Sequence, residues 1–424
     1  MVNKQLLTNN VMLISEPIAQ SSTVAIGFWF SIGSRSETKD CRGITHFTEH
    51  LIFKGTATKS THDIACIFDR IGGYINAYTE KEAVCVYCVV PYSKENFRIA
   101  LETLCDIAEN ATFPEEEVER ERIVVENEIT AVSDDPEESA LDYVSSSIWP
   151  SQTISQTIAG SIKDVESLGR EQIKSWYEKH FVGGELRVSV AGCFDGDVLV
   201  KILSSLQMHK KPVNYPEQKH YDEKPSWHSG FFYKRSPFNQ TQVFALYPYH
   251  VPVTEKENYI LSVFNAITGD TMSSRLFEAL REKSGYCYNV YSFFSIYEDA
   301  VAWCAYASSD RKNGGKVLKL LEKELQNLME SPITDEEVEE AKLHLAGEET
   351  INSEDVEYCM KRNQRNYSMG FKLLTKEEAI KTIMAVTKDD IQNLVYNLVK
   401  NKDRAEVYYG KGLSFNEKRK HYAE

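Results

Sequence analysis

The feature that most constrains the fold is a repeat within the sequence at an interval of about 220 residues. Phe113–Glu119 (Phe-Pro-Glu-Glu-Glu-Val-Glu) corresponds to Ile333–Glu339 (Ile-Thr-Asp-Glu-Glu-Val-Glu), an offset of 220 residues. A second correspondence, between Gln172–Gly192 and Asp390–Gly410, has an offset of 218 residues. Self-similarity at a nearly fixed interval indicates a duplicated structural unit. We therefore expect two halves built on one plan.

The apolar patterns of both halves predict the same order of elements. In the first half we expect strands at 23–30, 74–79 and 83–90 and helices at 45–54, 61–71, 94–110 and 115–133. In the second half we expect strands at 241–248, 286–297 and 300–307 and helices at 257–268, 272–283, 313–329 and 335–350. Each half is thus predicted to be an α+β unit, in which a mostly antiparallel sheet packs against helices.

A polar segment separates the two halves. Residues 208–228 contain three prolines and show no apolar periodicity, which is typical of a semi-rigid linker. We predict a first half at 1–212, a linker at 213–228 and a second half at 229–424.

Composition excludes several classes of protein. The 424 residues are 42% hydrophobic and 26% charged, as in soluble globular proteins. No apolar stretch is long enough for a membrane helix, and the N-terminal segment lacks the pattern of a secretory signal, so we expect a cytoplasmic protein. The net charge of −15, without a Lys/Arg stripe, argues against nucleic-acid binding. Cys85 and Cys88 have CxxC spacing, but on a strand they would point to opposite faces, which argues against a metal or redox pair.

The segment His46-Phe-Thr-Glu49-His50 carries the strongest chemical signal. On a helix, residues four apart lie about 40° apart around the axis, so His46 and His50 can reach one ion together. Glu49 lies on the same face. Neutral imidazoles are good zinc ligands, and a carboxylate beside the metal can accept a proton from water. The alternative is a pair of exposed histidines beside a surface glutamate.

A catalytic zinc usually has three protein ligands, and the third is expected on the helix at 115–133. Glu121 and Glu128 are seven residues apart and share one face of this helix. We expect Ile123, Val124 and Ile129 at nearby core-facing positions. Because Glu126 points elsewhere, Glu128 is the better ligand and Glu121 a supporting carboxylate.

These motifs together resemble a known family. The segments His46–Gly55, Gly72–Thr79 and Glu121–Glu128 are similar to those of the inverted zinc peptidases of the pitrilysin, insulysin and mitochondrial-processing-peptidase family. The resemblance extends to Gly160–Val165 and Ser274–Tyr288, and the length is similar to that of the bacterial processing-peptidase branch. It implies two halves that form a clam-shell around a chamber, with one zinc ion per chain in the first half.

The resemblance also implies roles for individual residues. His46, His50 and Glu128 would bind zinc, Glu49 would be the catalytic base, and Glu121 would support the site. A strand formed by Asn76, Ala77 and Tyr78 would pair with an extended substrate. Arg281 and Tyr288 of the second half would contact the substrate near the scissile carbonyl; the alternative is that they are a helix-end arginine and a strand tyrosine without this role.

The resemblance implies that the protein is a zinc metalloendopeptidase, which hydrolyses unstructured peptides and forms a homodimer. The alternative is a catalytically silent family member that serves as a subunit or scaffold. The sequence departs from this branch in one respect: the spacing from His50 to Glu128 is two residues longer, which indicates an insertion near Val89–Asn96. An alternative register would make Glu126 the third ligand.

Overall fold

The computed structural model describes residues 1–207, 221, 224–399 and 403–413. Much of the predicted linker at 213–228 lies outside these residues. The contacts divide the chain into two compact units. The first consists of Met1–Ala131, Gln156–Tyr221 and Ile351–Thr375, and the second of Val132–Ser155, Asp222–Thr350 and Lys376–Glu424. The linear boundaries given above stay a prediction.

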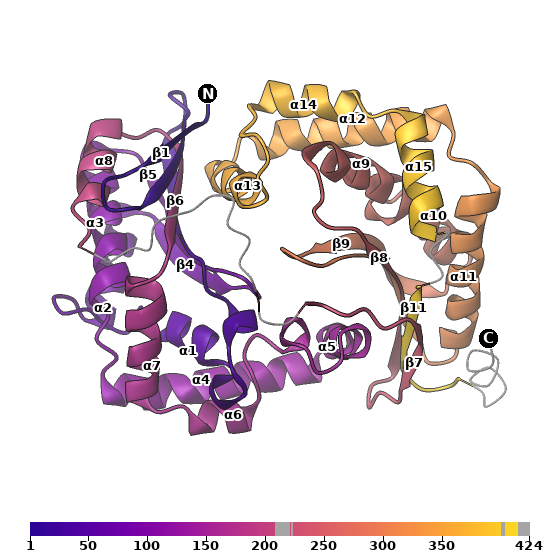
Figure 1. The fold of residues 1–424 in the computed structure, drawn as a ribbon, viewed down its shortest axis with the longest axis horizontal. Coiled ribbons are helices and arrows are strands. Elements are labelled where there is room, and N and C mark those ends of the chain that lie inside the picture. Colours follow the sequence, from indigo (N-terminus) through magenta and orange to yellow (C-terminus); the bar gives the residue numbers. More distant parts are fainter. Residues whose placement is uncertain (208–220, 222–223, 400–402, 414–424) are drawn as a thin grey trace. The chain divides into compact units, whose positions relative to one another are not determined.

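The first unit contains a six-stranded mixed sheet in the order β1-β2-β6-β3-β5-β4 (Figure 1). Its strands are β1 (Asn3–Leu6), β2 (Met12–Pro17), β3 (Thr23–Phe30), β4 (Tyr74–Thr79), β5 (Val84–Pro91) and β6 (Leu186–Gly192). The β2–β6 pair is parallel and the others are antiparallel. β3 is buried along almost its whole length, because sheet neighbours flank it and both its faces are covered. β4 forms one edge of the sheet.

One face of this sheet packs against helices of the same sequence half, and their apolar side chains form one continuous core. These helices are α1 (Ile44–Leu51), α2 (Thr61–Ile71), α3 (Lys94–Asn110), α4 (Glu115–Asp134), α7 (Arg170–Tyr177) and α8 (Gly196–Ser204). The short helix α6 (Ile162–Ser167) adds Val165 to the same core.

The opposite face of the sheet is covered by α13 (Val356–Ser368), a helix from the second half of the sequence (Figure 1). Cys359 and Met360 of α13 pack against Trp29 of β3 and Cys85 of β5. Cys88, three residues after Cys85, lies in the core on the other face. The expectation that Cys85 and Cys88 point to opposite faces of the strand is therefore confirmed. All nine cysteines are free thiols.

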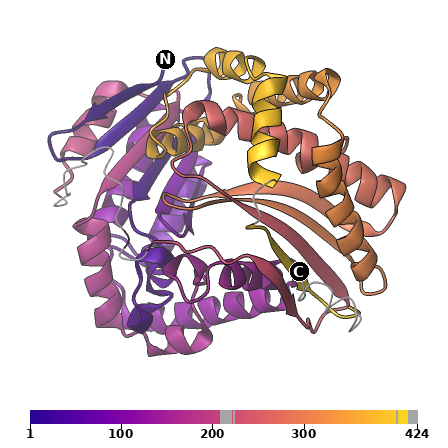
Figure 2. The ribbon, with the colours of Figure 1, turned by 45° about the vertical axis from the view of Figure 1, so that its right-hand side comes forward.

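The second unit contains a five-stranded mixed sheet in the order β7-β11-β8-β10-β9. Its strands are β7 (Gly230–Lys234), β8 (Gln240–Tyr249), β9 (Cys287–Ile296), β10 (Val301–Asp310) and β11 (Ala405–Tyr409). Helix α5 (Pro136–Ile148), from the first half of the sequence, packs on one face against Phe244 and Leu246 of β8. Figure 2 shows the long strands of this sheet beside α11 (Gly314–Glu330), in orange, and α15 (Lys388–Val399), in yellow.

The remaining helical segments of this unit include those predicted at 257–268, 272–283 and 335–350. They are α9 (Glu255–Asn265) with the π-helical turn Ala266–Asp270, α10 (Arg275–Phe277) with the π-helical turn Glu278–Lys283, α12 (Asp335–Asn352) and α14 (Lys376–Met384). The α+β class, with two mixed sheets packed against helices, is confirmed. In the described part of the chain, no helix is both long and apolar enough to cross a membrane.

Of the helices that the prediction lacks, α5 and α13 form a corresponding pair. Each has 13 residues, and their first residues, Pro136 and Val356, are 220 positions apart, so they belong to the same duplication. Each packs on the sheet of the compact unit formed largely by the other sequence half. Local periodicity carries no information about which sheet a helix covers, so this exchange is a property of the tertiary structure alone.

Candidate metal centre

Helix α1 carries His46, Glu49 and His50, and its N-terminus is fixed by a buried carboxylate. The two oxygens of Glu37 accept hydrogen bonds from the backbone N–H groups of Gly43, at 2.7 Å, and Thr45, at 2.8 Å. These are N–H groups that the helix itself cannot satisfy. Gly43 has φ of +80°, and a Cβ there would lie 2.4 Å from the carbonyl oxygen of Ala159, so only glycine fits.

The ligating atoms of two histidines and one glutamate converge. Nε2 of His46 lies 3.3 Å from Nε2 of His50. Oε2 of Glu128, on α4, lies 3.2 Å from Nε2 of His50 and 3.8 Å from Nε2 of His46. The Glu49 carboxylate belongs to the same group, since ligand atoms of His46, Glu49 and His50 lie within 4.8 Å of one another.

This triangle of atoms has the size that zinc requires. Zinc–nitrogen and zinc–oxygen bonds of about 2.0–2.1 Å in tetrahedral geometry place neighbouring ligand atoms roughly 3.3–3.4 Å apart. The separations of 3.2, 3.3 and 3.8 Å around His46, His50 and Glu128 bracket that value. Two imidazoles and a carboxylate are also a common donor set for a catalytic zinc. The residues present therefore fit the metal.

The charge states of the histidines follow from their surroundings. Burial lowers the pKa of His46 to about 4, with a further lowering by His50, so its ring is neutral at pH 7. Burial also acts to lower the pKa of His50, but the hydrogen bond to Glu121 and the nearby carboxylates outweigh it and raise this pKa. In the metal-free site His50 therefore holds a proton more tightly than His46 does, and below the pKa of His50 a metal ion must displace that proton.

The Glu49 side chain lies beside the two histidines. Its side chain is buried, and Oε2 accepts a hydrogen bond from Oγ1 of Thr79 at 3.0 Å. Burial raises the pKa of the Glu49 carboxyl, while His50 and the Thr79 hydrogen bond oppose this rise. A raised carboxyl pKa suits a group that must both take up and release a proton near neutral pH.

Helix α4 supplies Glu121 and Glu128 from the side that faces the site. Val118, Glu121 and Val125 are buried at the spacing of one helix face, and Ile129 packs against the same core. The assignment of Ile123 and Val124 to core-facing positions is wrong, because these side chains are 60% and 42% exposed. Ile123 lies about 200° around the helix from Glu121, on the opposite face, and Val124 lies at the edge of the buried face.

Glu121 contacts the site without belonging to the triangle. Its Oε1 lies 3.0 Å from Nδ1 of His50. A carboxylate at Nδ1 holds the proton on that nitrogen and leaves the lone pair of Nε2 free to bind a metal.

The predicted substrate strand lies at a sheet edge. Asn76, Ala77 and Tyr78 belong to β4, which pairs with β5 on one side. The Ala77 N–H donates to Oδ1 of Asn76 at 2.9 Å. This N–H therefore points away from β5, toward the free edge.

Arg281 and Tyr288 belong to the second compact unit. Arg281 lies in the π-helical turn Glu278–Lys283, with its guanidinium over the ring of Phe277 at 4.8 Å. Tyr288 is on β9 and is 59% exposed. Their roles at the site stay a prediction.

Sequence reasoning missed Glu37, which binds the first N–H groups of α1, and Thr79, which contacts Glu49. Glu37 precedes Gly43 by six residues, with no capping motif in the sequence to mark it. Thr79 is the last residue of β4, and its distance of 30 positions from Glu49 hides the contact. Only the alternation of β4, which directs every second side chain to the α1 side, could have indicated Thr79.

The fold and these residues define a class of protein. The insulinase peptidase family, M16, matches residues 11–161, and the M16 inactive domain matches residues 167–345. The chain belongs to the M16 peptidase family. The resemblance inferred from the sequence is thereby confirmed.

Several bacterial proteins are similar to this chain. It is 30% identical over 401 residues to YmxG, an uncharacterized zinc protease of Bacillus subtilis, with 94% of this chain and 96% of the relative covered. An uncharacterized zinc protease of Rickettsia felis is 32% identical, with 91% and 92% covered. A solved M16 inactive-domain structure from Pseudomonas fluorescens has the same fold, with a TM-score of 0.88 at 16% identity, over 97% of this chain and 99% of that chain.

Proposed function

We propose that this chain is a zinc metalloendopeptidase that hydrolyses unstructured peptides. The observation that carries the proposal is the triangle formed by Nε2 of His46, Nε2 of His50 and Oε2 of Glu128, with the Glu49 carboxylate beside it. Family membership and relatives named as zinc proteases support the assignment.

The proposed chemistry divides between the metal and the protein. Zinc, when bound, polarises a carbonyl group and lowers the pKa of a coordinated water. Glu49 accepts one proton from the attacking water and passes it to the departing amine, which leaves the carboxylate unchanged after a full cycle. Thr79 fixes one oxygen of Glu49 through its hydrogen bond, so the other oxygen can accept that proton.

Substrate recognition is proposed to occur by strand addition. The free edge of β4 offers backbone groups at Asn76, Ala77 and Tyr78, and an extended peptide could pair with them. Main-chain hydrogen bonds make little demand on side chains, which suits a peptidase of broad sequence tolerance. We further propose that Arg281 and Tyr288 position the substrate near the scissile carbonyl, that the two halves enclose a chamber, and that the enzyme is a cytoplasmic homodimer.

Zinc content and peptide hydrolysis, measured on the same sample, test the proposal. The purified chain should hold one zinc ion and cleave a quenched, unstructured peptide. Glu49→Gln is the matched control, because this side chain is a base and not one of the three ligands. It should keep the zinc and lose at least about 100-fold in kcat.

Two outcomes would contradict the proposal. A chain that binds zinc but hydrolyses none of a diverse set of unstructured peptides would support the alternative, a silent subunit or scaffold. Activity of Glu49→Gln within a few-fold of the unsubstituted enzyme would show that Glu49 is not the base.

A further inference from the structure

The two oxygens of Glu121 have different partners. Oε1 lies 3.0 Å from Nδ1 of His50, and Oε2 lies 2.7 Å from Nζ of Lys54. The Glu121 side chain is 9% exposed and that of Lys54 is 24% exposed, so water screens this ion pair less than a surface pair. Lys54, Glu121 and His50 therefore form one chain of contacts that ends at the metal centre.

The backbone around Lys54 is fixed on both sides. Its N–H donates to the carbonyl oxygen of Leu51, in the last turn of α1, at 3.0 Å. The carbonyl oxygen of the next residue, Gly55, accepts from the N–H of Thr112 at 3.1 Å. Gly55 has φ of +125°, a conformation that other residues rarely adopt. Because Thr112 leads into α4, this bond ties the loop after α1 to the helix that carries Glu121.

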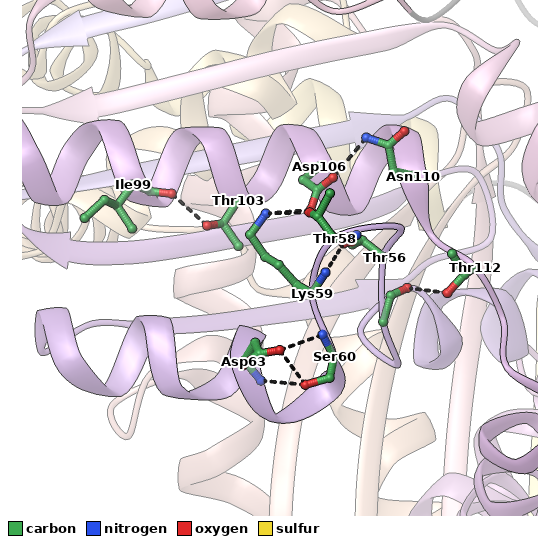
Figure 3. Close-up of polar contacts among 11 residues, drawn as sticks. Thr56, Thr58, Lys59, Ser60, Asp63, Ile99, Thr103, Asp106, Asn110 and Thr112 are labelled. Atoms are coloured by element: carbon green, nitrogen blue, oxygen red, sulfur yellow. Dashed lines mark hydrogen bonds and ion pairs between the residues drawn. The ribbon is translucent and has the colours of Figure 1, made fainter.

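A separate cluster fixes the rest of this loop (Figure 3). Oδ2 of Asp106, on α3, accepts hydrogen bonds from Oγ1 of Thr56 at 2.7 Å and Oγ1 of Thr58 at 3.1 Å, and pairs with Nζ of Lys59 at 2.7 Å. The two lysines of the loop thus have different tasks: Lys59 anchors the loop to α3, and Lys54 reaches the carboxylate beside His50.

We infer that Lys54 is a positioning residue for the metal centre: it holds Glu121 so that this carboxylate orients His50. With Oε2 bound to Lys54, the carboxylate cannot rotate without breaking an ion pair, and Oε1 stays at Nδ1 of His50. The His50 ring is then kept in the orientation and tautomer that present Nε2 to the other ligands. This inference rests on the proposed zinc site, and no sequence motif considered above assigned a role to Lys54.

The direction of the change in zinc affinity on replacement of Lys54 distinguishes a positioning role from a purely electrostatic effect of its charge. A lysine ammonium near a divalent cation repels it, so removal of the charge alone would tighten zinc binding. Loss of orientation at His50 would weaken zinc binding. Replacement of a partner that orients a metal ligand typically weakens metal affinity by about 10–100-fold, and Lys54 acts one contact further out, so we expect roughly 5–10-fold.

The experiment is a chelator competition that measures the zinc Kd of the full-length protein. Lys54→Met should raise Kd by roughly 5–10-fold, and Lys54→Arg, which keeps the charge and donor groups, should recover most of the affinity. Lys59→Met is the matched control, since it removes a lysine ion pair from the same loop without touching Glu121; it should leave Kd within about twofold. Circular dichroism and thermal unfolding show whether each variant folds.

A double substitution distinguishes positioning from a general structural role. Glu121→Gln should itself weaken zinc binding, and Lys54→Met in that background should add less than about twofold, because its route to His50 is already cut. Three results would overturn the inference. The losses of zinc affinity in the double variant could add in full, or Lys54→Met could bind zinc as tightly as the unsubstituted protein or more tightly. The third is an equal loss of affinity in Lys59→Met. Absence of zinc binding in the unsubstituted chain would instead refute the proposed metalloenzyme itself.

Discussion

Nδ1 of His50 lies 3.0 Å from Oε1 of Glu121, a residue 71 positions further along the chain. This contact joins α1 to α4 and places the Nε2 atom of the same ring within 3.2 Å of Glu128. The two nitrogens of His50 thus contact two different glutamates of α4, Glu121 at Nδ1 and Glu128 at Nε2. The consequences of this arrangement can be tested by metal binding, pH dependence and substitution.

Zinc affinity should fall as the pH is lowered through the raised pKa of His50. The hydrogen bond to Glu121 and the surrounding carboxylates raise this pKa above its ordinary value of 6.5, so below the raised pKa the free site holds a proton that zinc must displace. Below that pKa, the apparent affinity should drop by up to about tenfold per pH unit. Chelator competition between pH 8 and pH 5.5 measures the profile. Glu121→Gln should move its midpoint to lower pH; an unchanged midpoint would show that Glu121 does not act on His50.

The third ligand can be identified by comparing two glutamates on one helix turn. Glu128→Ala should weaken zinc binding by roughly 100-fold or more, because it removes a carboxylate 3.2 Å from Nε2 of His50. Its side chain is 48% exposed, so the substitution should leave folding intact. Glu126→Ala is the control and should retain zinc. The reverse result would establish the alternative register, with Glu126 as the ligand.

Glu37 should make stability depend on pH. Burial raises the pKa of its carboxyl to about 7, from an ordinary value of 4.5, so the folded state binds a proton more tightly than the unfolded state does. The contribution of Glu37 to stability is therefore present below about pH 4.5 and is lost as the pH rises toward 7, by as much as about 3 kcal/mol.

Urea unfolding of the metal-free protein at pH 5 and pH 8 tests the predicted contribution of Glu37 to stability. The stability difference between the unsubstituted protein and Glu37→Gln should shrink as the pH rises, since glutamine does not titrate. Glu95→Gln, at an exposed position of α3, should show no such change. A constant difference for Glu37→Gln would mean that this carboxyl does not titrate between these pH values.

The free edge of β4 should bind substrate through its backbone. Ala77→Pro removes an N–H that points away from β5, so the sheet itself should lose no ladder hydrogen bond. We expect kcat/KM for an unstructured peptide to fall by roughly tenfold, the equivalent of one good hydrogen bond, with zinc content unchanged. A peptide locked in a folded hairpin should resist cleavage. Rapid cleavage of the locked peptide would refute strand addition.

Arg281 and Tyr288 should affect catalysis without affecting the metal. Arg281→Ala and Tyr288→Phe remove exposed groups, so both variants should fold and bind zinc as before. If these side chains position the substrate, kcat/KM should fall by about 10–100-fold. Activity and zinc content that both match the unsubstituted enzyme would leave the two residues with purely structural roles.

The sequence by itself determined part of the order of elements and the core of the site. Helix α2, strand β4 and helix α3 begin and end at the predicted residues, because apolar periodicity, a capping serine and flanking glycine or proline are all local signals. The spacing of His46, Glu49 and His50 likewise needs nothing beyond one helix turn. Chemistry confined to a single element can be read from the chain.

Contacts across long sequence distances were decided by the tertiary structure. The alternation of β4 directs Thr79 to one face but does not identify Glu49 as its partner. No local pattern indicates that Glu37 satisfies the first N–H groups of α1 or that Lys54 reaches Glu121. The same holds for α13, whose apolar face covers Trp29 and Cys85 on the sheet built from the first half of the sequence. Periodicity records that a helix face will be buried, but the burying partner is selected by the packing of the whole chain, because hydrophobic burial has no direction of its own.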